Sequence, residues 1–185
     1  MTETEEKIIE AAIRTFVRYG AKKTSMADIA SKARVSRQTL YDLFGNKDEL
    51  IVTSIQHVTY ASLTAVKDRW VGVSRLTDKL DIYFEETIIK SYELIQSSGD
   101  PEDLISGHNE AGKAAISEAH QQHEALIVEM LMEYKPQIEE KGQRLEQLAH
   151  FFVKVAMSFK GSATNLSDLN ELINSLKIAV EMAIQ

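Results

Sequence analysis

The segment 25–44, SMADIASKARVSRQTLYDLF, constrains the fold of this chain more than any other stretch. Its apolar residues follow two separate helical periods. Ile29 and Ala33 are four residues apart, and Leu40 and Leu43 are three apart, so each pair lies on one face of a helix. The pattern predicts two short helices joined by a tight turn, with both apolar faces turned inward.

Two serines indicate where these helices begin. Ser25 is a candidate N-cap, and Asp28, three residues later, can return a hydrogen bond to it as in a capping box. Ser36 is a second candidate N-cap at the start of the second helix. If that helix turns its leucines inward, four hydrogen-bonding side chains point outward: Arg37, Gln38, Thr39 and Tyr41.

These outward side chains suit a helix-turn-helix, which presents the first part of its second helix to base edges in the major groove. Arginine can bind guanine, glutamine can bind adenine, and threonine offers a hydroxyl or a methyl group to thymine. We therefore expect base contacts from Arg37, Gln38 and Thr39. The alternative is an ordinary helical hairpin with a polar outer face.

Charge is distributed unevenly along the chain, which carries −7 in all. Residues 1–47 hold nine cations and six anions, so they carry +3, and the remaining 138 residues carry −10. Attraction to phosphate depends on the local field within about a Debye length of ~8–10 Å. A basic N-terminal region on an acidic body is therefore compatible with binding to double-stranded DNA.

Composition excludes several other classes. The chain of 185 residues has no cysteine, only two prolines and eight glycines, which excludes cysteine-ligated zinc and favours long helices. No apolar run approaches the ~18 residues of a membrane helix, and the acidic start MTETEEK is unlike a signal peptide. We expect an all-α, cytoplasmic protein that is no enzyme, has no catalytic residue and no cofactor, and does not contact a membrane.

The rest of the chain reads as a succession of amphipathic helices. One spans about residues 3–19 and ends at Gly20, and a long one begins at Lys47 and reaches about Trp70. The loop before Ser25 exposes helix-start amides that suit a phosphate. Candidate phosphate contacts are therefore Thr24, Ser25, Tyr41 and Lys47; for the two hydroxyls, simple capping is the alternative.

The last two helices have apolar residues on more than one face, which predicts an antiparallel pair that forms a four-helix dimer interface. Its expected residues are Leu148, Phe152, Val155, Phe159, Leu169, Leu172, Ile173, Leu176 and Val180. Phe151, Ile178 and Met182 lie off the main apolar stripes. The alternative is an internal helix pair in a monomer.

The middle helices can enclose a pocket for an apolar small molecule. Its candidate lining residues are Trp70, Tyr83, Phe84, Tyr92, His108, Met130 and Tyr134. The alternative for each is plain core. His120 and His123 share a helix face as a metal pair would, but a solvated polar face explains this pair better, so we expect no metal site.

Three short stretches resemble, in order and spacing, the N-terminal domain of the TetR-like bacterial transcriptional regulators. They are TSMADIA at 24–30, VSRQTLY at 35–41 and FGNKDEL at 44–50. Arg34 stands where that family usually has glycine, so we expect a left-handed backbone there despite its Cβ, at a cost of about 1 kcal/mol. Leu43 replaces the usual histidine or tyrosine.

The resemblance implies a DNA-binding helix-turn-helix domain over residues 1–47 and a larger helical domain for effector binding and dimerisation over 48–185. It implies a homodimeric repressor that leaves a palindromic operator when an unknown small molecule binds among the middle helices. Two other classes remain open: a helical enzyme or metal protein that uses His108, His120 and His123, and a module that binds another protein.

Overall fold

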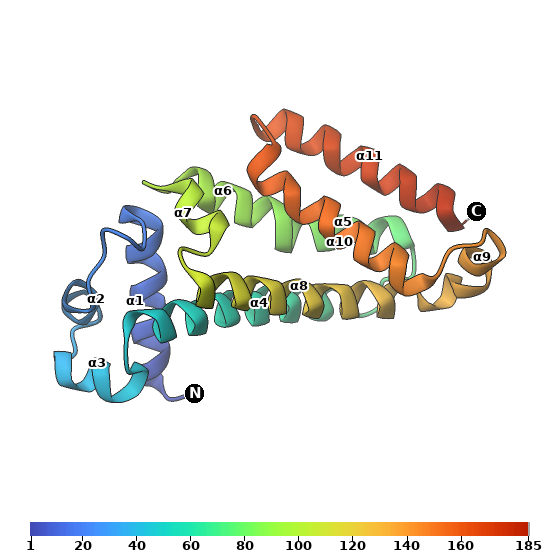
Figure 1. Ribbon diagram of the computed structural model, residues 1–185. Helices are drawn as coiled ribbons and strands as arrows, with labels where there is room; N and C mark the ends of the chain where they lie inside the picture. The colour runs from blue at the N-terminus through green and yellow to red at the C-terminus, as the bar shows by residue number, and fades with distance from the viewer. Residues whose placement is uncertain (185) are drawn as a thin grey trace. The chain divides into compact units, whose positions relative to one another are not determined.

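The computed structural model describes residues 1–184, and this part of the chain contains helices, turns and no strand (Figure 1). The all-α prediction is therefore confirmed. The helices are α1 Glu3–Tyr19, α2 Met26–Ala33, α3 Arg37–Phe44, α4 Lys47–Trp70, α5 Leu76–Phe84, α6 Lys90–Gln96, α7 Pro101–Ser106, α8 Glu110–Leu131, α9 Lys135–Glu140, α10 Leu145–Ser162 and α11 Leu166–Ile184. A π-helical turn, Glu85–Ile89, joins α5 to α6. No helix within residues 1–184 is long and apolar enough to cross a membrane.

The chain divides into two compact units. The first unit comprises residues 1–61 and 93–119, and the second comprises residues 62–92 and 120–185. Three helices, α4, α6 and α8, contribute residues to both units. The domain boundary that we expect after residue 47 remains a prediction.

The core of the first unit forms because α1, α2 and α3 each have one apolar face. Ile8, Ile29 and Leu40, one from each helix, are completely buried. Helix α1 begins with a capping box between Thr2 and Glu5 and ends at Gly20, which has the positive φ of +79° that a glycine permits. These three helices form the unit that carries the predicted helix-turn-helix.

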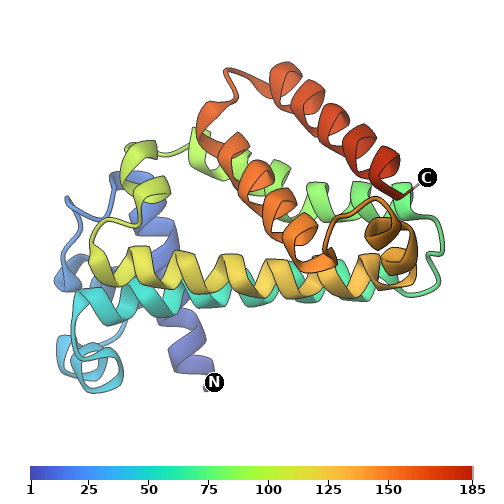
Figure 2. The ribbon, with the colours of Figure 1, turned by 45° about the vertical axis from the view of Figure 1, so that its right-hand side comes forward.

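The core of the second unit lies around the antiparallel helices α10 and α11, which are adjacent in Figure 2. Seven of the nine residues that we expect at a dimer interface are buried in this core: Leu148, Phe152, Phe159, Leu169, Ile173, Leu176 and Val180. Val155 and Leu172 are partly buried against it. These side chains already pack within one chain, which leaves them little surface for a partner, and their place at a dimer interface stays a prediction.

Other apolar side chains of the same two helices remain on the surface. Phe151 on α10 is 54% exposed, and Ile178 and Met182 on α11 are 57% and 66% exposed. The apolar stripe that the sequence shows most clearly thus stabilises the fold of the single chain. The residues that lie off that stripe are the ones available to a partner.

Candidate nucleic-acid interface

The turn between α2 and α3 has the local structure that the sequence predicts. Ser25 Oγ accepts a hydrogen bond from the Asp28 backbone N–H at 3.2 Å, and Asp28 Oδ2 accepts from the Ser25 N–H at 2.9 Å. The Ser25 hydroxyl also donates to Asp28 Oδ2 at 2.6 Å, and this bond, together with the one from the Ser25 N–H, lowers the pKa of Asp28. Arg34 ends α2 in the left-handed conformation, with φ 57° and ψ 42°. The capping box and the left-handed Arg34 are both confirmed.

Helix α3 begins at the predicted N-cap, where Ser36 Oγ accepts from the Thr39 N–H at 2.9 Å. Leu40 and Phe44 form the buried face of α3, whereas Leu43 is 40% exposed. The prediction that Leu43 faces inward is therefore wrong. Leu40 and Phe44 are four residues apart and point into the core, which places Leu43 on the adjacent, exposed side.

The structure brings the predicted base-contact residues together on the surface of the first turn of α3. Arg37 and Gln38 are exposed and Thr39 is half-buried. Gln38 Nε2 donates to Asp42 Oδ1 at 2.6 Å, and the hydroxyls of Thr39 and Ser36 lie 2.8 Å apart. Within residues 1–184, the guanidinium of Arg37 forms no hydrogen bond or ion pair, so it is the donor most available to a ligand.

The predicted phosphate contacts differ in how exposed their side chains are. Tyr41 and Ser25 are exposed, although the Ser25 hydroxyl donates to Asp28 at 2.6 Å. Thr24 is only 4% exposed, and its hydroxyl donates to the Gly20 carbonyl at 2.8 Å. A phosphate contact from the Thr24 side chain is therefore contradicted. That hydroxyl instead closes the loop between α1 and α2.

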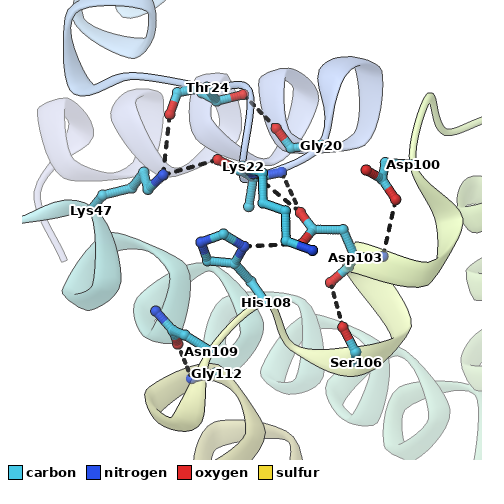
Figure 3. Close-up of polar contacts among 11 residues, drawn as sticks. Gly20, Lys22, Thr24, Lys47, Asp100, Asp103, Ser106, His108, Asn109 and Gly112 are labelled. Carbon is cyan, nitrogen blue, oxygen red and sulfur yellow. Dashed lines mark hydrogen bonds and ion pairs between the residues drawn. The ribbon is translucent and has the colours of Figure 1, made fainter.

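Lys47, at the start of α4, also belongs to this loop. Its ammonium donates to the carbonyl oxygens of Ala21 at 3.0 Å and Thr24 at 3.4 Å (Figure 3). A cation at a helix N-terminus is electrostatically unfavourable, and these two acceptors offset that cost. Lys47 therefore holds the loop that precedes α2, in addition to any contact with DNA.

A buried carboxylate from α7 holds the other side of the same loop (Figure 3). Asp103 Oδ2 accepts from the backbone N–H groups of Ala21 at 2.7 Å and Lys22 at 3.3 Å. His108 Nδ1 donates to the second oxygen, Oδ1, at 2.9 Å. Burial alone raises the pKa of Asp103, but the hydrogen bonds from His108, Lys22 and Ala21 bring it below its usual value.

Sequence reasoning missed Asp103 and misplaced His108. We expect His108 in an effector pocket, but the structure places it in the first unit with Asp103. Asp100 and Pro101 are a recognisable helix start, and they do begin α7. No local signal, however, indicates that Asp103 binds backbone groups 82 and 81 residues away.

The surroundings of the helix-turn-helix are positive. Residues 11–47 hold eight cations and two anions. Arg14, Arg18 and Lys32 line a shallow hollow of about 220 Å³ between α1 and α2. This local excess of positive charge is the property that favours the phosphate backbone of DNA.

The other candidate pocket residues lie around the core of the second unit. Tyr83, Phe84, Tyr92 and Met130 are buried there, and Trp70 and Tyr134 pack against them half-buried. Trp70 Nε1 donates to the Lys79 carbonyl at 2.9 Å. The structure thus brings six of the seven candidates into one apolar cluster, and His108 is the exception.

Together, the capped α2 and α3, their left-handed turn and the exposed polar start of α3 define a helix-turn-helix of the DNA-binding class. Residues 8–52 match the family described as bacterial regulatory proteins, tetR family. Residues 8–52 are therefore similar in sequence to a TetR-family helix-turn-helix domain.

Characterised and solved relatives agree with this assignment. The chain is 38% identical over 79 residues to the HTH-type transcriptional regulator TtgR of Pseudomonas putida; the match covers 43% of this chain and 35% of TtgR. It is 36% identical over 53 residues to the HTH-type transcriptional repressor SCO4008 of Streptomyces coelicolor, covering 29% of this chain and 28% of the repressor. The chain therefore matches about a third of the length of such relatives.

Similarity in fold extends over the whole chain. The structure of the fatty acid degradation regulator FadR from Bacillus halodurans gives a TM-score of 0.73 at 18% identity, covering 97% of this chain and 95% of that one. A transcriptional regulator from Saccharomonospora viridis, solved in complex with choline, gives 0.67 at 15% identity, covering 98% and 97%. At these identities the likeness establishes the fold alone.

Proposed function

We propose that this chain is a sequence-specific transcriptional regulator, most simply a repressor, which binds double-stranded DNA in the cytoplasm and is released by a small molecule. The observation that carries the proposal is the exposed, polar first turn of α3 within a TetR-family helix-turn-helix. The names of the relatives, a transcriptional regulator and a transcriptional repressor, support it. A DNA-reading surface of this kind requires no catalytic group.

In this proposal Arg37, Gln38 and Thr39 contact base edges in the major groove. Arg37 is the strongest candidate because its guanidinium is exposed and unpaired within residues 1–184, and arginine binds guanine through two hydrogen bonds. Gln38 must exchange its hydrogen bond with Asp42 for one with a base. The amides at the start of α2, together with Ser25, Tyr41 and Lys47, would hold phosphates.

We further propose that the protein acts as a homodimer, because helix-turn-helix proteins that bind palindromic operators are two-fold dimers. The proposed contact is the outer face of α10 and α11. Phe151, Ile178 and Met182 are more than half exposed there, and exposed large apolar side chains on neighbouring helices favour association.

The effector site is proposed for the aromatic cluster of the second unit, which Tyr83, Phe84 and Tyr92 help to build. One observation favours this place. The π-helical turn Glu85–Ile89 interrupts the regular helix beside it, and such turns are frequent at functional sites. That the Saccharomonospora viridis neighbour was solved in complex with choline supports a small-molecule effector in general. The ligand must prefer the conformation that binds DNA poorly.

Selection of bound sequences from random duplex DNA, at about 50 and 200 mM salt, tests the proposal. We expect a palindromic consensus whose two half-sites are one or more helical turns apart, with affinity that falls steeply as salt rises. Equal recovery of all sequences at both salt concentrations would contradict base recognition by α3.

A further inference from the structure

The loop between α1 and α2, residues 20–25, contains two neighbouring lysines with different surroundings. The Lys22 ammonium lies 3.7 Å from Asp103 Oδ1, and the Lys22 backbone N–H donates to the same carboxylate at 3.3 Å. Lys23 is exposed, and within residues 1–184 its ammonium forms no hydrogen bond or ion pair. The loop therefore presents one cation that is already paired and one that is available to a ligand.

The backbone on both sides of Lys23 is held by other elements (Figure 3). The N–H groups of the two preceding residues donate to Asp103 Oδ2 at 2.7 and 3.3 Å. On the other side, the buried Thr24 donates its hydroxyl to the Gly20 carbonyl at 2.8 Å, and its own carbonyl accepts from Lys47 at 3.4 Å. A loop that is held before binding loses less conformational freedom when a ligand binds. The exposed lysine is thus carried by a pre-organised backbone.

The segment that carries Asp103 is docked directly on the end of α1. The Gly99 N–H donates to the Val17 carbonyl oxygen at 3.1 Å. A Cβ at position 99 would lie 2.6 Å from the Arg18 carbonyl oxygen, so any side chain there would force the two backbones apart. This close approach places the Asp103 carboxylate, which is 0% exposed, beside the loop. Water therefore does not compete with the loop amides for its oxygens.

Lys23 also lies close to the start of α2, where the proposed function places a phosphate. Two peptide units separate Lys23 from the N-cap Ser25, so their Cα atoms are at most about 7.6 Å apart. The other charged groups at this helix start already have partners, because Asp28 accepts from Ser25 and Lys47 donates to the loop carbonyls. A free cation beside the amides of a helix start complements a phosphate at the same place.

We propose that Lys23 binds a phosphate of the DNA backbone beside the start of α2, and that Asp103 positions Lys23 by holding the loop. The inference rests on the proposed function, since it names a contact of that same interface. A lysine bound to a phosphate releases a condensed counterion and recognises no base. Lys23 supplies the contact that the Thr24 hydroxyl, bonded to Gly20, does not make. Asp103 is fully buried and acts only through the loop.

The salt dependence of DNA affinity tests the contact, with the paired lysine of the same loop as the matched control. We expect Lys23→Gln to weaken binding of the full-length protein about 3- to 10-fold, as for one hydrogen bond. It should also reduce the slope of log affinity against log salt by about 0.9 for each half-site, without changing the selected consensus. Lys22→Gln should change this slope much less. A slope in Lys23→Gln equal to that of the wild type, or equal changes in both variants, would overturn the proposal.

Ethylation of single phosphates in the DNA shows where the contact lies. Ethylation of a phosphate that the protein binds removes its charge and interferes with binding. Lys23→Gln should become insensitive to ethylation at one phosphate in each half-site, whereas Lys22→Gln should keep the full wild-type pattern. A complete wild-type pattern in Lys23→Gln would show that Lys23 binds no phosphate directly.

A double-mutant cycle tests the positioning role of Asp103. In an Asp103→Ala background the loop no longer holds Lys23 in place, so Lys23→Gln should weaken DNA binding less than it does in the wild type. Asp103→Asn keeps one acceptor oxygen for the loop amides and should restore part of the Lys23 effect; it also replaces Asp103→Ala if that variant does not fold. A Lys23 effect of the same size in all three backgrounds would assign Asp103 a merely structural role and overturn the positioning.

Duplex DNA of random sequence distinguishes this inference from the proposed function. Phosphate contacts do not depend on sequence, so the effect of Lys23→Gln on the salt slope can be measured on any duplex. Sequence-specific binding with an unchanged slope would contradict the phosphate contact alone. A reduced slope without any sequence preference would contradict the regulator and leave the contact standing. A wild-type protein that binds no DNA would contradict both.

Discussion

At the scale of single residues, His123 shows how burial determines a chemical property. An unfolded histidine has a pKa near 6.5, whereas burial and the charges of Lys160 and His120 lower the pKa of folded His123 to about 3. Between these values the unfolded chain takes up a proton that the folded chain does not. The free energy of unfolding must therefore fall as the pH falls from about 6.5 towards 3.

We predict that His123→Gln reduces this acid sensitivity. Through this one group, each pH unit below 6.5 lowers the free energy of unfolding of the wild type by up to about 1.4 kcal/mol. We would measure the free energy of unfolding in urea at pH 7.5 and at pH 5. Between these two pH values it should fall by about 2 kcal/mol more for the wild type than for His123→Gln. His57→Gln, a change of a half-buried histidine on α4, is the control. Equal losses in wild type and His123→Gln would show that the buried imidazole has no such role.

Residue-level predictions from the sequence succeeded where the determinants are local. Ser25, Ser36 and Arg34 are positioned by hydrogen bonds and backbone angles within four residues of themselves, and all three were predicted correctly. Leu43 and Thr24 were not, because their exposure depends on what packs against them. The core selects Phe44 in place of Leu43, and the hydroxyl of Thr24 bonds to Gly20.

At the scale of elements, the loop between α1 and α2 is held from two sides. Lys47 of α4 binds its carbonyl oxygens, and Asp103 of α7 binds its backbone N–H groups (Figure 3). The chain turns closely between α7 and α8: a Cβ on Gly112, in α8, would lie 1.8 Å from the carbonyl oxygen of Gly107, which follows α7. Only glycine at position 112 permits this approach.

We predict that Asp103→Ala loosens this loop. The change leaves the Ala21 and Lys22 N–H groups without their acceptor, and such a loss costs about 1–3 kcal/mol. Amide hydrogen exchange at these two residues should become faster, and the free energy of unfolding of the first unit should fall by that amount. Glu102→Ala, an exposed change on the same helix, should do neither. Unchanged exchange in Asp103→Ala would mean that the carboxylate does not hold the loop.

The docking of α7 on the loop between α1 and α2 is a contact that the sequence does not predict. Helical periodicity and breakers in the sequence predicted α1, the α2–α3 pair, α4 and the two final helices. Helix α7, Pro101–Ser106, is not among the helices that we predict from the sequence. Its docking on residues 21 and 22 could not be predicted either, because contacts across 80 residues depend on the packing of every element between them.

At the scale of the whole molecule, the apolar residues of α10 and α11 raise the question of which helix face packs in the core and which meets a partner. A helix that is apolar on two sides has one face for its own core and one for something else. The sequence predicts two such faces, and we expect the more regular one at the dimer interface. Phe152 and Leu169 of that face are 0% exposed in one chain, which is why we propose the other, exposed face as the contact.

We predict that Phe151→Lys combined with Ile178→Lys prevents dimer formation. Both changes place a charge on an exposed apolar position, so the monomer should keep its fold while association is lost. Analytical ultracentrifugation should give a dimer for the wild type and a monomer for the variant. The variant's affinity for a complete palindrome should approach its affinity for one half-site.

Val71→Lys is the matched control for this pair of changes. Val71 is 82% exposed, but it lies in the turn after α4 and outside α10 and α11. A double variant that still sediments as a dimer would show that another surface joins the two copies.

The central claim is that the first turn of α3 recognises bases, and the measurement that tests it most directly is a repeated sequence selection with Arg37→Ala. The account predicts that the variant loses preference at one base pair in each half-site and binds the wild-type consensus about 1–3 kcal/mol more weakly. Lys32→Ala, which removes an exposed cation from α2, should weaken binding without changing the consensus. An unchanged consensus for Arg37→Ala would contradict the claim.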